Sequence, residues 1–323
     1  MFKIIHGSIS PNKLSAYCVV YNEMFYLPAF LDHYRSLGIE QFIFIDDGST
    51  DESFAYLASQ PDTVIAQPEM RYGDKLNGKR AGPQWKSIFA QRYLQGRWSL
   101  CVDADEFLVF GLPSLHDVIE KAESRGDLGL GAVMVDMYPA QLAALDGTEA
   151  PNSFSSMLQS YPFFDRGPYL DWQVGLLKPR VIYEGAFGRL LKEHAIRTSD
   201  YSSRLTRFLE RIRPAKARSV FKVPLVRWGA GLQYLNAHTL NHAPTTCDGL
   251  ALLHFKFTSA LREKMNWAIE RKSFNKGSRG YFALQAVLFN PSIRRNEFTY
   301  EGTCRYGSYQ DLEAAEIIPL KRK

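Results

Sequence analysis

The chain has 323 residues, of which 46% are hydrophobic and 23% charged, and its formal net charge is +5. This composition is typical of a folded protein with one large or two small domains, and it excludes a disordered or low-complexity chain. No apolar run approaches the ~20 residues of a transmembrane helix, and no signal-peptide segment is visible at the N-terminus. The four cysteines are scattered without metal-binding spacing, so we expect free thiols in a reducing, cytoplasmic compartment.

The first hundred residues alternate between apolar runs of strand length and helical patterns. The predicted strands cover residues 14–20, 41–45, 63–67 and 98–102. Three helices are predicted. The first begins at Leu27 and ends before Gly38, the second extends through Leu57, and the third covers residues 82–95. This order predicts βαβ units and a parallel sheet, which binds ligands at the carboxyl ends of its strands.

After Glu106 the pattern becomes mixed. Further strands are predicted over 131–138, 179–183 and 249–257, and helices and loops from Ser259 onward. The segment from Lys178 to Lys222 contains twelve lysines and arginines but only four acidic residues, which gives a local net charge of +8. This stretch indicates either an anionic partner or a solvated face. Within it, residues 204–212 predict a basic amphipathic helix that packs on the core or rests on a membrane surface.

Three carboxylates interrupt the apolar run W-S-L-C-V-D-A-D-E-F-L-V-F, at Asp103, Asp105 and Glu106. Burying a carboxylate is costly unless it is paired, hydrogen-bonded or bound to metal. If the strand continues, Asp103 and Asp105 point the same way, and two like charges so close favour a bridging cation. Carboxylates together with substrate phosphates suit Mg²⁺ or Mn²⁺. The pattern predicts a metal clamp for a diphosphate, against the alternative of an ordinary surface turn.

Three strings stand in order after successive predicted strands: V-V-Y-N-E (19–23), I-D-D-G-S-T-D (45–51) and V-D-A-D-E-F (102–107). Together they resemble the family 2 glycosyltransferases with the GT-A fold. The strings K-V-P-L-V-R-W (222–228) and A-L-L-H-F-K-F (251–257) are similar to a bacterial subset of that family. The likeness covers residues 14–110 well and 222–257 moderately.

The resemblance implies an α/β fold, the Rossmann-like GT-A fold, with a mostly parallel sheet flanked by helices. Residues 1–257 would form the glycosyltransferase domain, with a nucleotide-binding half (1–110) and an acceptor half (111–257). Residues 258–323 would form a C-terminal helical extension.

Site residues follow from the same resemblance. Those expected at the nucleotide are Tyr21, Asn22, Glu23, Asp46, Asp47, Lys79, Arg80 and Asp103. The expected metal ligands are Asp103, Asp105 and His254. A core histidine is the alternative for His254, and His238 and His242 compete with it for the ligand role.

The implied reaction is an inverting sugar transfer from a nucleotide-diphosphate sugar, with UDP-sugar as the expected donor and Mn²⁺ or Mg²⁺ as the cofactor. The acceptor hydroxyl would belong to a glycan or a lipid-linked glycan. Because the acidic pair usual in the family is missing, Asp171 and Glu106 are the candidate catalytic bases, with Asp165 and Glu184 as alternatives. A sugar-phosphate nucleotidyltransferase and a non-catalytic nucleotide-sugar-binding module are the alternatives. Contact with an anionic membrane at the cytoplasmic face is expected, and nucleic-acid binding is not.

Overall fold

The computed structural model describes residues 1–147, 149–172, 175–194, 219–244, 249–271, 275–289 and 296–318. The predicted basic helix at 204–212 lies outside these residues. Within them, no helix combines the length and apolar character needed to cross a lipid bilayer.

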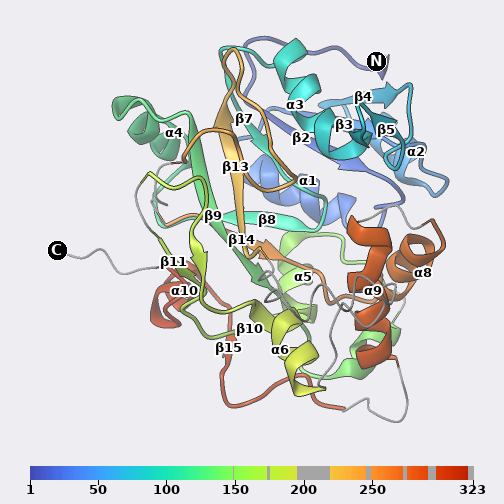
Figure 1. Cartoon of the computed structure of the whole chain (residues 1–323), viewed down its shortest axis with the longest axis vertical. Coiled ribbons are helices and arrows are strands. Elements are labelled where there is room, and N and C mark those ends of the chain that lie inside the picture. The colour runs from blue at the N-terminus through green and yellow to red at the C-terminus, as the bar shows by residue number, and fades with distance from the viewer. Residues whose placement is uncertain are drawn as a thin grey trace.

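A central sheet runs through the molecule with helices on both faces (Figure 1). In the described part of the chain its strand order is β1-β4-β3-β2-β7-β13-β9-β14-β8. These strands are β1 (Phe2–His6), β2 (Ser15–Val20), β3 (Gln41–Asp46), β4 (Thr63–Pro68), β7 (Trp98–Cys101), β8 (Glu106–Val109), β9 (Gly129–Asp136), β13 (Phe221–Arg227) and β14 (Ala251–His254). The short strands are β5 (Lys75–Leu76), β6 (Lys79–Arg80), β10 (Phe163–Asp165), β11 (Leu170–Asp171), β12 (Arg180–Val181) and β15 (Thr303–Arg305).

The helices are α1 (Leu27–Ser36), α2 (Ser53–Ala58), α3 (Ala81–Tyr93), α4 (Leu115–Ser124), α5 (Phe154–Ser160), α6 (Gly185–Glu193), α8 (Leu261–Arg271), α9 (Asn275–Leu288) and α10 (Tyr309–Ala314), with the 3₁₀ helix η1 (Leu142–Asp146). Gly38 follows the C-cap of α1 with a φ of +86°, and its N–H donates to the carbonyl of Arg35. The predicted glycine stop of this helix is confirmed.

Four neighbouring strands in the N-terminal half of the sheet are parallel, as the βαβ pattern predicts, whereas β1 at the edge is antiparallel to β4. Strands β4, β3, β2 and β7 pair in parallel. The second half is mixed, because β13 is antiparallel to both β7 and β9, whereas β14 is parallel to β9 and antiparallel to β8. The α/β class is therefore confirmed, with a mixed central sheet.

Strands β2 and β3 are apolar on both faces because helices cover both. On one face Cys18 and Phe44 belong to the cluster that contains Phe30 of α1. On the other face Tyr17 stacks against Phe89 of α3, with ring centroids 6.3 Å apart. Burial on both sides explains why these strands read as continuous hydrophobic runs rather than alternating ones.

Strand β13 is absent from the predicted elements because Pro224 interrupts its sequence. Proline cannot donate to a sheet ladder, and the register of β13 against β9 shifts between Lys222 and Leu225. The strand nevertheless lies in the middle of the sheet, between β7 and β9. It brings Lys222, which is fully buried, next to the turn that follows β7.

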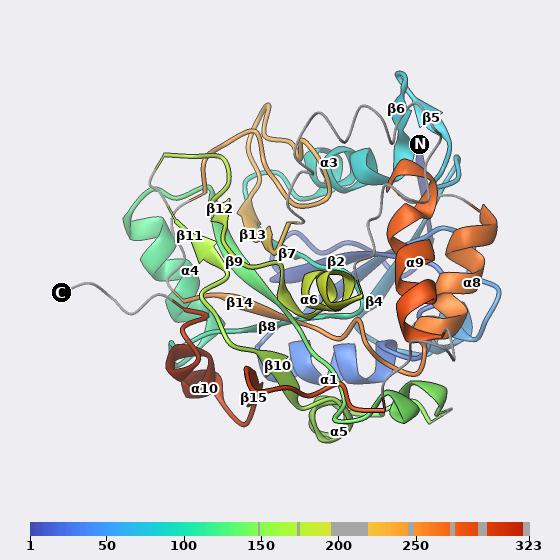
Figure 2. The same cartoon turned by 60° about the horizontal axis from the view of Figure 1, so that its bottom comes forward.

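Helices α8 and α9 pack against each other on one side of the molecule (Figure 2). Their apolar residues share a cluster with α6 and η1, including Met265, Leu284 and Phe187. Farther along the chain, β15 pairs with β10. The segment after residue 257 is thus joined to the first part of the chain by helix packing and by strand pairing.

Candidate functional site

Polar side chains gather at one edge of the sheet. Strands β2, β3, β7, β9 and β14 all run the same way, so their carboxyl ends meet there. The antiparallel strand β13 begins at the same edge. The residues delivered by these strand ends are Tyr21 to Glu23, Asp46 and Asp47, Asp103 to Glu106, Asp136, Lys222 and His254.

Two loops at this edge are joined by the side chains of the D-G-S-T-D-E-S segment. The N–H groups of Asn22, Glu23 and Met24 donate to Ser49, Ser53 and Asp51, at 3.0, 3.0 and 3.2 Å. The side chain of Asn22 in turn accepts from the Thr50 N–H at 2.7 Å. Ser49 also donates to Asp46, so this carboxylate closes its own turn. In this structure Asn22 and Asp46 hold the loops in place.

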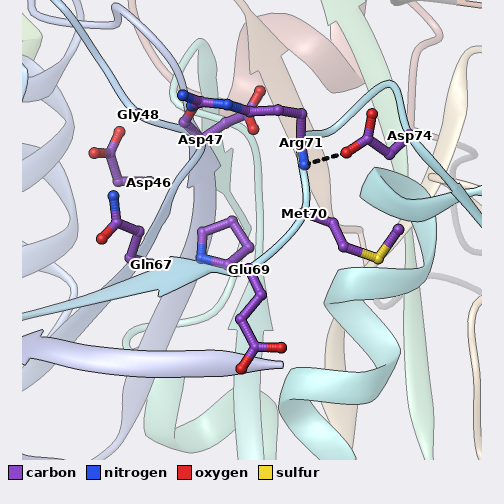
Figure 3. A pocket seen from close by; sticks show the side chains of 9 residues that line it. Asp46, Asp47, Gly48, Gln67, Glu69, Met70, Arg71 and Asp74 are labelled. Atoms are coloured by element: carbon purple, nitrogen blue, oxygen red, sulfur yellow. Dashed lines mark hydrogen bonds between the residues drawn. The ribbon is translucent and has the colours of Figure 1, made fainter.

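Asp46 and Asp47 line a cavity of about 220 Å³ between the ends of β3 and β4. Figure 3 shows Arg71 lying across Asp47 and Gly48. The Arg71 guanidinium donates to the Asp47 carbonyl at 2.6 Å, and the Tyr72 N–H donates to the Asp47 carboxylate at 3.0 Å. Gly48 has a φ of +79°, which only glycine adopts readily. The cavity is therefore small, polar and supported by backbone contacts.

The structure corrects the expected geometry of the D-A-D string. Strand β7 ends at Cys101, and the chain turns, with the Glu106 N–H donating to the Asp103 carbonyl at 3.0 Å. The two-residue alternation of a strand therefore does not apply to Asp103 and Asp105. Their carboxylates contact different partners, and we name the two groups the Asp103 side (Asp103, Lys86, Lys222 and Glu106) and the Asp105 side (Asp105, His254, Asp136, Lys264 and Glu23).

On the Asp103 side, two buried lysines hold one carboxylate. Lys86 of α3 donates to one oxygen of Asp103 at 2.7 Å and Lys222 of β13 to the other at 3.1 Å. Burial raises the pKa of Asp103, but the Lys222 and Lys86 ammonium groups outweigh it and hold the pKa below its usual range. The Asp103 side chain itself is 40% exposed. Asp103 is therefore a partly exposed carboxylate held in position by two buried lysines.

Glu106, one of the two predicted bases, is buried and contacts the turn and Lys222. Its carboxylate accepts from the Asp103 N–H at 2.8 Å and pairs with Lys222. Burial raises its pKa, against the opposing effect of Lys222. Because its side chain is only 2% exposed, an acceptor hydroxyl has no access to it. This burial does not favour Glu106 as a catalytic base, and that role stays a prediction.

On the Asp105 side, a histidine stands between two carboxylates. His254 Nδ1 lies 2.8 Å from Asp136 Oδ1, and Nε2 lies 3.7 Å from Asp105 Oδ2. Burial lowers the pKa of His254, but Asp105 and Asp136 outweigh it and raise the pKa above its usual value. Asp136 also accepts from the Phe187 N–H at 3.3 Å, at the start of α6. Asp136 therefore fixes the orientation of the imidazole ring.

A third lysine completes the Asp105 side. Lys264 of α8 donates to Glu23 at 2.9 and 3.3 Å and to Asp105 Oδ2 at 3.1 Å. Burial raises the pKa of Asp105, but Lys264 and His254 outweigh it and hold the pKa well below its usual value. Burial raises the pKa of Glu23 to about 7, despite the nearby Lys264. The carboxylates of the Asp103 side and the Asp105 side thus each have a lysine or histidine neighbour.

Asp105 and His254 are the predicted ligands that the geometry suits to a divalent cation. Their facing atoms are too far apart to hydrogen-bond, yet both could bind one cation at about 2.1 Å. A carboxylate behind the imidazole, here Asp136, is the usual second neighbour of a metal-binding histidine. Both oxygens of Asp103 contact lysines instead. Among the described residues, no three Asp, Glu, His or Cys side chains form a complete metal cage. A cation here would need water or phosphate oxygens as further ligands.

The remaining predicted residues lie around this centre. Tyr21 packs edge-on against Trp267 of α8, with ring centroids 5.1 Å apart. Arg80 is the N-cap residue of α3, without a side-chain capping hydrogen bond, and Lys79 is exposed on the β5–β6 hairpin. Asp171 is half-buried in β11 and pairs in register with Arg180. In the described part of the chain, no contact joins Asp171 to the carboxylates of the site, so its role as a base stays a prediction.

The competing histidines lie elsewhere. His238 Nδ1 contacts the carbonyl of Phe221 at 3.1 Å, beside Lys222. Burial, followed by Lys222, lowers the pKa of His238 to about 3. His242 is exposed in the following loop. Of the three histidines considered, His254 is the one that faces Asp105.

Three residues of the site were absent from the predictions: Lys86, Asp136 and Lys264. Asp136 carried a readable signal, because it ends a buried strand just as Asp46 does. Lys86 follows Trp85 on a buried helix face, where an unpaired lysine would be costly. Lys264 gave no signal, because its helix is strongly polar and its partners lie more than 150 residues earlier.

Comparisons with known proteins add little at the sequence level. No protein-family model matches the chain, and no curated protein matches it either. The solved structures with a similar path include those of nucleotidyltransferases. One is assigned as a glucose-1-phosphate thymidylyltransferase from Bacillus anthracis, in complex with sucrose, with a TM-score of 0.32 and 6% identity over 94% of each chain. Two are of the UDP-glucose pyrophosphorylase from Acinetobacter baumannii, one of them UTP-bound, with TM-scores of 0.27 and 0.28 and 11% identity over 94% of this chain and 92% of that one. Neither family nor activity is inferred from a likeness at this level.

Proposed function

We propose that this chain is a glycosyltransferase that uses a nucleotide-diphosphate sugar and a divalent cation. The observation that carries the proposal is the placement of His254 Nε2 3.7 Å from Asp105 Oδ2, with Asp136 behind the imidazole ring. This arrangement stands at the carboxyl edge of the sheet, where α/β proteins bind their ligands. The cavity beside Asp47 lies at the same edge.

Asp105 and His254 would hold the cation, Mn²⁺ or Mg²⁺, and water and donor phosphate would supply its other ligands. When bound, the cation would neutralise the charge that develops on the departing nucleoside diphosphate. This chemistry suits a diphosphate leaving group, because hard cations of this kind bind carboxylate and phosphate oxygens together.

The chain's own groups would bind and orient the donor. Asp47 and the cavity around it would receive the nucleoside, and the exposed Asp103 would contact its ribose. Lys86 and Lys222 keep Asp103 ionised and fix its position from below. UDP-sugar stays the preferred donor, a glycan or lipid-linked glycan the preferred acceptor, and Asp171 the proposed base for an inverting transfer.

The test is nucleotide release from a panel of nucleotide-diphosphate sugars, with Mn²⁺ present or chelated. A glycosyltransferase should release the nucleoside diphosphate slowly from at least one donor, and chelation should stop the release. A nucleotidyltransferase would instead consume a nucleoside triphosphate and a sugar 1-phosphate, releasing pyrophosphate. A binding module would be stabilised by a nucleotide sugar without turnover of either kind.

Asp105→Ala is the decisive variant. We expect it to abolish the metal-dependent thermal stabilisation by donor and to lower turnover by a factor on the order of 10²–10³, because it removes a cation ligand that acts on the leaving group. Asp62→Ala is the matched control, since Asp62 pairs with Arg35 on the surface. Full donor-plus-metal stabilisation in Asp105→Ala would refute the assignment of the site.

A further inference from the structure

Lys264 reaches the site from a helix that the sequence analysis set apart as a C-terminal extension. It stands on α8, 159 residues after Asp105, yet its ammonium lies between Asp105 and Glu23. The side chain is 16% exposed, and those of Asp105 and His254 are 10% and 9% exposed. Lys264 therefore covers the pair of side chains that suits a divalent cation.

The ammonium and a divalent cation would need the same carboxylate oxygen. Lys264 Nζ lies 3.1 Å from Asp105 Oδ2, and that oxygen is the one facing His254 Nε2. Two cations on one oxygen repel strongly in a site with little water. Binding of a divalent cation at Asp105 and His254 therefore requires the ammonium to withdraw from Asp105.

Glu23 can keep the Lys264 ammonium paired after it withdraws from Asp105. Both Glu23 oxygens already accept from Lys264, at 2.9 and 3.3 Å. The Glu23 N–H is anchored to the buried Ser53 hydroxyl, so the loop that carries this carboxylate is held in position. A small rotation of the lysine could break the contact with Asp105 and keep the contact with Glu23.

We infer that Lys264 is a placeholder cation, which neutralises Asp105 in the ligand-free protein and is displaced onto Glu23 when a divalent cation binds at Asp105 and His254. The inference rests on the proposed function only for the presence of that cation. It makes Lys264 a positioning residue, and it predicts that the native lysine weakens metal binding. A merely structural ion pair would have the opposite effect, because its loss would loosen the site.

The test measures Mn²⁺ binding without any nucleotide, from the electron paramagnetic resonance signal of free Mn²⁺. We expect Lys264→Met to bind Mn²⁺ more tightly than the wild type, by a factor on the order of ten, because a competing charge has been removed. Lys264→Arg, which keeps a cation at this position, should bind less tightly than Lys264→Met. Arg262→Met should match the wild type, because it removes a charge from the same helix at the Asp146 contact.

Equal or weaker Mn²⁺ binding by Lys264→Met would overturn the inference, as would tight binding by Lys264→Arg. If the lone substitution prevents folding, the double variant Glu23→Gln/Lys264→Met removes both charges and should still bind Mn²⁺ more tightly than the wild type. Asp105→Ala should lose binding, and Mn²⁺ binding by this variant equal to wild type would overturn the shared site. Because no sugar nucleotide is present, failure to find a donor would leave the result readable.

Discussion

The Asp103 side and the Asp105 side are centred on two residues of one turn, with only Ala104 between them, yet they are built differently. On the Asp103 side the cations are buried and the carboxylate is exposed, since Lys222 and Lys86 are 0% and 4% exposed and Asp103 is 40% exposed. On the Asp105 side the carboxylate is covered, by a lysine from α8 and a histidine from β14. The comparison teaches that a D-x-D string does not by itself say which carboxylate is available to a cation.

The pKa values of the histidines near the two sides are shifted in opposite directions. His238, beside Lys222, has its pKa lowered to about 3 by burial and then by that lysine. His254, between Asp105 and Asp136, has its pKa raised because the two carboxylates outweigh burial. Burial and a neighbouring ammonium thus lower the histidine pKa in the first region, and two carboxylates raise it in the second. The second region is the one where we propose that one cation replaces another.

The largest expected effect on stability comes from removing Lys222, one of the two buried lysines of the Asp103 side. Lys222→Met leaves Glu106 buried without its ammonium partner and takes one of two lysines from Asp103. Removing one member of a buried ion pair costs about 3–5 kcal/mol, so we expect a loss of that size in the free energy of unfolding. Urea denaturation monitored by circular dichroism measures it.

Lys264→Met is the matched control for that experiment. It also removes a lysine from a pair of carboxylates, but Lys264 is partly exposed, and we propose that Mn²⁺ replaces it at Asp105. We expect a smaller loss of stability, which excess Mn²⁺ restores in part, whereas Mn²⁺ restores nothing in Lys222→Met. Equal losses with an equal response to Mn²⁺ would show that the two sides are not distinct.

The pH dependence of stability sharpens the comparison at His238. Its folded pKa of about 3 lies below the unfolded value of about 6.5. The unfolded chain therefore binds a proton that the folded chain refuses, so the stabilisation present above pH 6.5 is lost as the pH falls toward 3. Between pH 6.5 and 5, where few carboxylates titrate, the melting temperature of the wild type should fall more than that of His238→Gln.

The control for this experiment is His242→Gln, because His242 is exposed. Its melting temperature should follow that of the wild type across the same pH range. If the melting temperatures of His238→Gln and His242→Gln fall with pH to the same extent, folding does not lower the pKa of His238, and the charge environment assigned to the Asp103 side is wrong.

The parts of this structure that follow from local pattern could be predicted from the sequence, and the parts that depend on distant contacts could not. The parallel strands β2, β3, β4 and β7 are continuous apolar runs ending in turn-forming residues. Strand β13 is hidden by Pro224, and its place between β7 and β9 depends on packing. The same division holds for the site: the string around Asp105 was visible, but Lys264 comes from a polar helix with no local signal.

The turn after β7 shows why even a visible motif can mislead. A strand reading places Asp103 and Asp105 side by side, whereas the turn directs them to separate partners. In the turn, Glu106 accepts from the Asp103 N–H and pairs with Lys222, which arrives from β13. The local sequence does not reveal this distant contact.

The smallest expected effect concerns the loop that carries Glu23 on the Asp105 side. Ser53 is buried, and its hydroxyl accepts from the Glu23 N–H at 3.0 Å. Ser53→Ala leaves this N–H without its partner, so we expect a loss of about 1 kcal/mol in the free energy of unfolding. Ser59→Ala is the control, because its exposed hydroxyl donates to a carbonyl at the end of α2 and should matter less.

If Glu23 is the position to which Lys264 withdraws, Ser53→Ala should also weaken Mn²⁺ binding slightly, because a displaced Glu23 holds the ammonium less well and returns it to Asp105. Unchanged Mn²⁺ binding in a measurably destabilised Ser53→Ala would show that the ammonium does not depend on the anchored position of this loop.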